Sequence, residues 1–182
     1  MSPFDPGRQY LEDAIFSMRK LKQQGEDALA QVTDEQLGVA PDPESNSLAV
    51  LIQHLSGNMI SRWTDFLTSD GEKPDRDRDA EFEPPARPGR ASLMKRWDEG
   101  WDRAFRALEP LGPEDLGRIV LIRREEHTVL LAIQRQLTHY AYHVGQIVYL
   151  AKHLRGPEWK TLSVPRGASR AHNVAGGAYR KT

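Results

Sequence analysis

The chain has 182 residues, and its 25 Lys and Arg residues nearly balance 26 Asp and Glu residues, for a formal net charge of −1. A domain so close to neutrality has no broad positive field for a phosphate backbone, which argues against a dedicated nucleic-acid binder. Its lack of cysteine excludes disulfides, thiolate metal sites and a cysteine nucleophile. The longest aliphatic run, residues 48–52, is far shorter than the ~20 apolar residues of a membrane span. We therefore expect one soluble domain without a membrane partner.

Apolar residues recur at a helical period in two segments of the first half of the chain. Asp5 followed by Pro6 indicates a helix start, because the carboxylate accepts from free N–H groups and proline has its φ already set. This first helix is predicted over residues 6–32. After a stretch of turn residues, Asn46 or Ser47 can cap a second helix, predicted over residues 47–69.

The second half of the chain begins with a break. Residues 70–90 are rich in proline and alternating charge, which predicts a long surface connection that buries no apolar surface. A third amphipathic helix is predicted over residues 90–109, where proline ends it. The β-branched run at residues 118–123 suggests a short strand, and Thr128 then opens the longest helix, which ends near residues 155–156.

Four amphipathic helices without an internal repeat predict an all-α fold, a four-helix bundle over residues 1–156. The tail, residues 157–182, has few apolar residues, so we expect it to pack only partly on the bundle and its last ten or so residues to be loosely held. Residues 1–13 are acidic and amphipathic where an export signal has an apolar stretch, so a cytoplasmic location is expected.

Three histidines are the candidate metal ligands. His139 and His143 lie four residues apart in the predicted last helix, which places their side chains on one face, about 6 Å apart at Cβ. Such a pair also occurs on solvent-exposed helix faces, and His54, in the middle of the second helix, is by itself compatible with a buried histidine bonded to backbone. Brought together across a bundle, however, the three imidazoles would occupy one side of a coordination sphere and leave the other side open to water or substrate. That pattern is typical of a catalytic metal site.

Two amides lie one helical turn from these histidines. Asn58 follows His54 and Gln136 precedes His139, so each can orient a ligand, although ordinary hydrogen bonds within a bundle explain them equally well. The remaining histidines are not spaced to join the three. We expect His127 to be a surface or capping residue, and neither His153 nor His172 to bind metal.

The motif HYAYHVGQ in the last helix, with a lone histidine in QHLSGN on the second, resembles the DinB-like, or YfiT-like, metalloprotein superfamily. The segments SGNMISRWTDFLTSDGEKP and WKTLSVPRG are similar to a branch described only as DinB family proteins of unknown function. Carried over by position, the ligands fall on His54, His139 and His143. Gly145 and Gln146 match the residues that follow the last ligand, and Gln146 joins the amides that could support the site. Residue 144, a valine here, departs from the many relatives that have a small or basic residue at that position.

The resemblance implies a bundle with up-down-down-up helix order, often dimeric, and a divalent metal, usually nickel or zinc, bound by three histidines. We also expect a homodimer because a small bundle carries large apolar groups such as Trp63, Trp97 and Phe105. The superfamily includes thiol-dependent S-transferases and proteins described as metal hydrolases.

An ion held by three neutral imidazoles keeps its double positive charge and favours an anionic further ligand. That ligand is a deprotonated water in a hydrolase, or a low-molecular-weight thiol that attacks a small-molecule substrate in a transferase. The competing alternative is a non-enzymatic, stress-related metal-binding or assembly protein. The sequence does not decide among these, and it leaves the catalytic residues unassigned.

Overall fold

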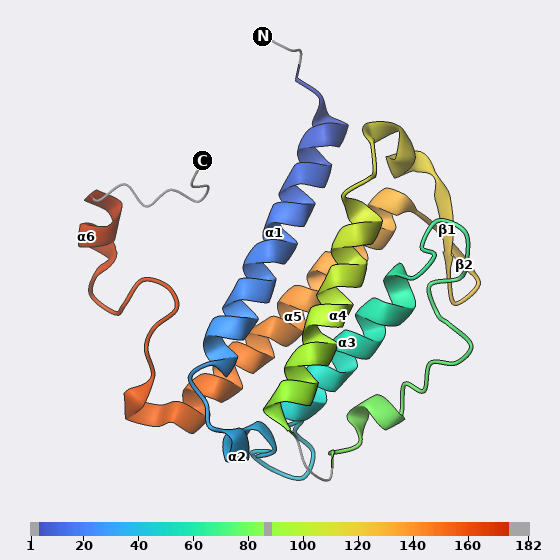
Figure 1. Ribbon diagram of the computed structural model, residues 1–182. Helices are drawn as coiled ribbons and strands as arrows, with labels where there is room; N and C mark the ends of the chain where they lie inside the picture. Colours follow the sequence, from blue (N-terminus) through green and yellow to red (C-terminus); the bar gives the residue numbers. More distant parts are fainter. Residues whose placement is uncertain (1–3, 86–88, 175–182) are drawn as a thin grey trace.

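The computed structural model describes residues 4–85 and 89–174. This part of the chain is predominantly helical (Figure 1). The long helices are α1 (Pro6–Leu29), α3 (Leu48–Trp63), α4 (Arg90–Leu108) and α5 (Val129–Arg155), and the short ones are α2 (Asp34–Leu37) and α6 (Ser169–Val174). Single 3-10 turns lie at η1 (Ala80–Phe82), η2 (Pro113–Gly117) and η3 (Gly156–Glu158). None of the described helices combines the length and the apolar character needed to cross a bilayer.

The predicted caps of the long helices are confirmed. Asp5 accepts from the backbone N–H groups of Gly7 and Arg8 at the start of α1, and Ser47 and Thr128 cap α3 and α5 in the same way.

Two predicted helix ends are wrong. Helix α1 ends at Leu29 rather than at residue 32, because Thr33 and Gln36 form a capping box that starts α2. Helix α3 ends at Trp63 rather than at residue 69, since the chain turns at Asp65, whose φ is 47°. Phe66 extends the helical pattern of apolar residues past the end of α3, because it lies in the turn and still packs against Trp63.

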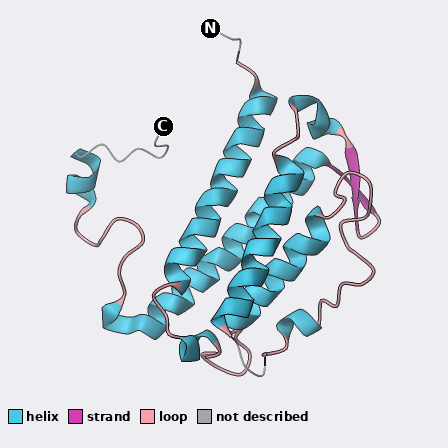
Figure 2. Cartoon of the chain, in the orientation of Figure 1, coloured by secondary structure: helices cyan, strands magenta, loops and turns pink. Residues whose placement is uncertain are grey.

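A two-stranded antiparallel sheet precedes α5 (Figure 2). Strand β1 (Ile119–Ile122) was predicted, whereas β2 (Glu125–Thr128) was not, because its exposed charged residues hide the alternation. Arg123 and Arg124 form the turn with φ of 55° and 65°, as a two-residue hairpin loop requires. Their N–H groups donate to the two carboxylate oxygens of Asp70 at 2.9 and 2.7 Å, which ties the hairpin to the chain that follows α3.

The long helices lie side by side and enclose one core (Figure 1). Helix α3 packs mainly on α4 and helix α1 on α5, and α3 also contacts α5. Trp97, Trp101 and Tyr140 are fully buried. Trp97 on α4 lies against Gly25 of α1, and the rings of Trp101 on α4 and Tyr140 on α5 are 5.4 Å apart. The phenol oxygen of Tyr140 accepts from the indole N–H of Trp63 at 2.7 Å, which joins α3 to α5 beside the candidate site.

Residues 70–83, which we call the strap, run along the outside of α3 from the hairpin to η1 (Figure 2). The prediction of a surface connection over residues 70–90 is correct for most of this segment. It is wrong at η1, where Glu81 is 7% exposed and the ring of Phe82 packs against the ring of His54, with centroids 4.5 Å apart and planes tilted by 34°. The reason is that a carboxylate can be buried when cationic side chains surround it. Part of the predicted loose C-terminal end, residues 175–182, lies outside the described residues.

Candidate metal site

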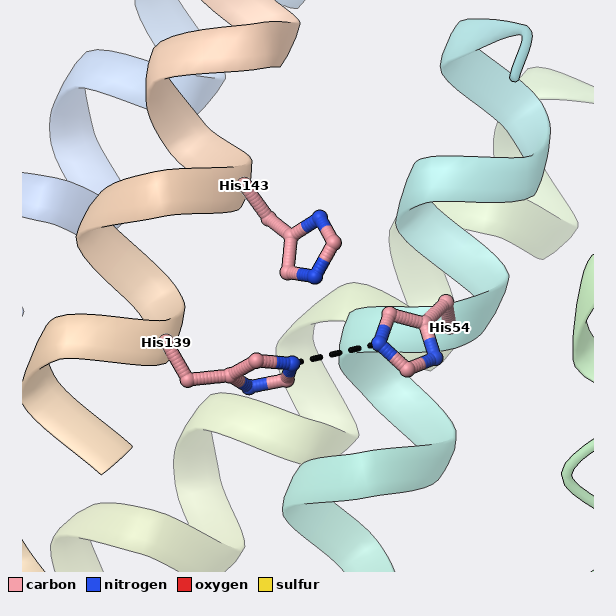
Figure 3. A group of neighbouring side chains, drawn as sticks. All are labelled: His54, His139 and His143. Carbon is pink, nitrogen blue, oxygen red and sulfur yellow. Dashed lines mark hydrogen bonds between the residues drawn. The ribbon is translucent and has the colours of Figure 1, made fainter. Parts of the chain in front are cut away.

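His54 on α3 faces His139 and His143 on α5, and the three rings converge on one point between the helices (Figure 3). One ligand nitrogen from each ring lies within 4.8 Å of the others. His54 and His143 are buried and His139 is half-buried. The structure therefore brings together the three histidines that the sequence singled out, and they could hold a metal ion.

Hydrogen bonds behind two of the rings decide which nitrogen faces the centre. Nδ1 of His54 donates to Oε2 of Glu81 at 3.0 Å, and Nδ1 of His143 donates to Oε1 of Gln146 at 2.8 Å. With the proton on Nδ1, Nε2 of each ring keeps its lone pair for a metal. Nε2 of His54 lies 3.2 Å from Nε2 of His139 (Figure 3).

Two of the three imidazoles, His139 and His143, are held in the neutral form that binds metals. Burial, together with the neighbouring His143 and His54, lowers the pKa of His139 to about 3. Burial also lowers the pKa of His143, against the hydrogen bond to Gln146, which raises it. No proton therefore has to leave these two rings before an ion binds near neutral pH.

The separations fit an ion without rebuilding the helices. Two ligands at 2.0–2.1 Å from a tetrahedral ion are about 3.3 Å apart, close to the 3.2 Å between the Nε2 atoms of His54 and His139. The ligand nitrogen atoms of the three histidines lie at most 4.8 Å apart, and a separation of that size would have to contract by about 1.5 Å to fit the ion. A side-chain rotation is sufficient for a shift of that size.

A buried ion-pair network lies behind His54. The carboxylate of Glu81 accepts from Nε and Nη2 of Arg76 at 2.7 and 2.8 Å in addition to the bond from His54. Burial raises the pKa of Glu81, but the bonds from Arg76 and His54 outweigh it, so the net shift is downward and the group is a carboxylate. Gly57 permits the close approach, because a Cβ at that position would lie 2.8 Å from Cδ of Glu81. The result is a carboxylate–histidine pair of the kind that orients metal ligands.

Residues 5–168 match a family described as a protein of unknown function, DUF1572. The chain belongs to this family. No curated protein of known function matches the chain. Because the match covers the helices, the hairpin and the strap together, all elements of the site lie inside the DUF1572 region.

The three amides expected near the site differ in what they do in this DUF1572 protein. Gln146 directly contacts one of the candidate metal ligands, His143. Asn58 and Gln136 are buried beside the histidines, but within the described residues no hydrogen bond reaches Oδ1 of Asn58 or Oε1 of Gln136. Two buried acceptors beside the histidines thus have no donor among the described residues.

A cavity of about 340 Å³ opens beside the three histidines. Its lining combines the histidines and the two unpaired amides with two aromatic rings and five arginines. These residues are His54, Asn58, Arg62, Arg76, Arg78, Phe82, Arg123, Arg135, Gln136, His139, Tyr142 and His143. The DUF1572 site is therefore accessible to a small molecule.

Sequence reasoning missed Glu81 and the arginines. A carboxylate within a run of alternating charges carries no signal that distinguishes it from its exposed neighbours. Arg62 and Arg135 did have one, because they lie one or two helical turns from a ligand histidine on the same face.

The other described histidines lie outside the group. His127 was expected at the surface or at a cap, but β2 buries it to 8% exposure. Its Nε2 accepts from Nη1 of Arg135 at 3.2 Å. His153 and His172 do not belong to the three-histidine cluster, in agreement with the sequence.

Proposed function

We propose that this protein is a divalent-metal-dependent enzyme that binds its ion through His54, His139 and His143. One observation carries the proposal: three imidazoles from two helices converge at the wall of a cavity large enough for a small molecule. A structural site would be closed by a fourth protein ligand, whereas a catalytic site keeps a position open.

The chain's own residues support such a site in two ways. Glu81 and Gln146 hold the Nδ1 protons of two rings, so the Nε2 atoms are presented together. Phe82 covers one face of His54 and limits the access of water from that side. A divalent ion bound there supplies a Lewis acid that lowers the pKa of a water or a thiol entering the open position.

Imidazole ligands suit zinc, nickel, iron and copper about equally, so the choice of nickel or zinc rests on the DinB-like resemblance. We propose that this DUF1572 protein is a member of that superfamily with an up-down-down-up bundle. The directions of the helices support this order, since α1 and α5 run one way and α3 and α4 the other (Figure 1).

Elemental analysis of protein purified without a histidine tag tests the metal. We expect near-stoichiometric metal in the wild type and a steep loss in His54→Ala, His139→Ala and His143→Ala. His153→Ala is the matched control on α5 and should keep its metal. Metal that survives His139→Ala would place the ion elsewhere and overturn the proposal.

Activity assays separate the reaction types. The metal-loaded protein is incubated with a small thiol such as bacillithiol plus an electrophile, and separately with a panel of esters and amides without thiol. Turnover that needs the thiol supports an S-transferase, and turnover without it supports a hydrolase. Stoichiometric metal with no turnover in either panel contradicts the enzymatic proposal and favours a metal-binding or assembly protein.

A further inference from the structure

We propose that the cavity beside the three histidines binds a small molecule by an oxyanion group, a carboxylate or a phosphate, held by arginines one to two helical turns from the metal ligands. This inference rests on the proposed function, because the other end of the molecule would face the ion.

Two stripes of polar residues face each other across the cavity. On α3, His54, Asn58 and Arg62 follow one another at intervals of four residues, and on α5 the positions of Arg135 and His139 repeat that interval. The helices are antiparallel, because the end of α3 that carries Arg62 meets the start of α5 that carries Arg135. The cavity therefore has a histidine end and an arginine end, separated by four to eight helical residues, about 6 to 12 Å along the helix axis.

Arg62 is the least satisfied charge in this region. Its side chain is 3% exposed, and among the described residues its ion-pair partner is Glu72, at 3.4 Å from Nη2. Across the part of the chain that the structure describes, Nε and Nη1 of Arg62 have no hydrogen-bond acceptor. A buried guanidinium with free donors costs stability unless a ligand supplies the acceptors.

The charges around the cavity do not cancel. Five arginines line it, and no acidic residue is among its lining residues. Glu72 and Glu81 lie behind this lining and pair with Arg76, while Glu72 also contacts Arg62 and Arg123. Arg78 lies over the ring of Phe82 and Arg135 contacts His127, so neither is neutralised by these pairs. Asp70 also lies near Arg62, and three carboxylates among five guanidinium groups still leave the cavity positive before an ion binds.

Guanidinium groups are matched in shape to carboxylates and phosphates, which accept two parallel hydrogen bonds. The volume of about 340 Å³ lies at the small end of ligand sites, so it suits a metabolite and not a polymer.

Calorimetric titration of the zinc-loaded protein with matched acids tests the inference. Glutarate and 4-phosphonobutyrate carry a second anionic group, whereas valerate has the same chain length and only one carboxylate. We expect one or both dianions to bind at least tenfold more tightly than valerate, and the better of the two identifies the oxyanion. Equal affinities for all three would overturn the inference.

Variants locate the binding group. Arg135→Gln and Arg78→Gln change exposed side chains and should fold as the wild type does, which circular dichroism checks. We expect at least one of them to reduce the preference for the dianion threefold or more without changing the zinc content. Arg106→Gln is the control, since Arg106 is outside the cavity lining and its side chain is 77% exposed. The inference would be contradicted if neither cavity variant changed the preference for the dianion. It would also be contradicted if Arg106→Gln changed that preference equally.

The two proposals fail in different ways. Loss of zinc stoichiometry in the wild type refutes the metal site itself. Stoichiometric zinc with no dianion preference refutes the arginine site alone.

Discussion

Replacement of Glu81 by alanine is the sharpest test of the network behind His54. The carboxylate accepts three bonds, from Nδ1 of His54 at 3.0 Å and from Nε and Nη2 of Arg76 at 2.7 and 2.8 Å. Removal of one partner from a buried ion pair costs about 3–5 kcal/mol of folding stability. Arg76 keeps a contact with Glu72 at 3.1 Å, so we expect the lower end of that range, about 3 kcal/mol. Loss of the acceptor for Nδ1 also frees the ring of His54 to rotate, which should weaken metal binding about 10- to 100-fold.

The two effects are measured separately. Urea unfolding with a chelator present gives the stability of the metal-free protein, and competition with a chromophoric chelator gives the metal affinity. A loss of about 3 kcal/mol lowers the urea midpoint by roughly 1–3 M. Glu83 lies two residues after Glu81, at the end of the strap, and is exposed. Glu83→Ala is therefore the matched control and should change neither the stability nor the metal affinity. If Glu81→Ala behaves like Glu83→Ala in both assays, the network neither stabilises the strap nor orients the histidine.

Three further predictions concern packing, a buried hydrogen bond and assembly. Gly57→Ala should weaken metal binding at least several-fold, because the added Cβ displaces Glu81. Gly145→Ala has open space around it and should raise the free energy of unfolding by about 0.5–1 kcal/mol, because alanine favours a helix. Equal effects of the two variants in urea unfolding and in metal titration would contradict this prediction. Tyr140→Phe should cost about 1–3 kcal/mol in urea unfolding, because the buried indole N–H of Trp63 loses its acceptor, and an unchanged midpoint would refute that reasoning. Analytical ultracentrifugation at micromolar concentration should show a homodimer, and a 20.6 kDa species would contradict that prediction.

The sequence predicts the helices because their apolar stripes and caps are local signals. Helix α4 begins and ends within one residue of the prediction, and the N-caps Asp5, Ser47 and Thr128 were read correctly. The end of α3 was not, because Phe66 is buried from a turn and imitates another helical position.

The histidines of the site were predictable for the same reason. Their spacing within one helix fixes a shared face, and His54 could be paired with them through the expected bundle. Glu81 could not be predicted, because its burial depends on contacts with both Arg76 and His54. His54 lies 27 residues away, and the strap sequence has no periodic pattern of apolar residues that would indicate this contact.

The strap and the helices contribute to the site under different constraints. His54 and His139 belong to helices whose other faces build the hydrophobic core, so these helices cannot shift without repacking it. In the described structure, no residue of the strap belongs to that core, yet Arg76, Arg78 and Phe82 line the cavity. Substitutions in the strap can therefore alter which molecules enter while the ligand geometry stays fixed. Proteins built on the same helices can thus diverge in substrate through this one exchangeable segment, and grafting it between relatives is a direct route to changed specificity.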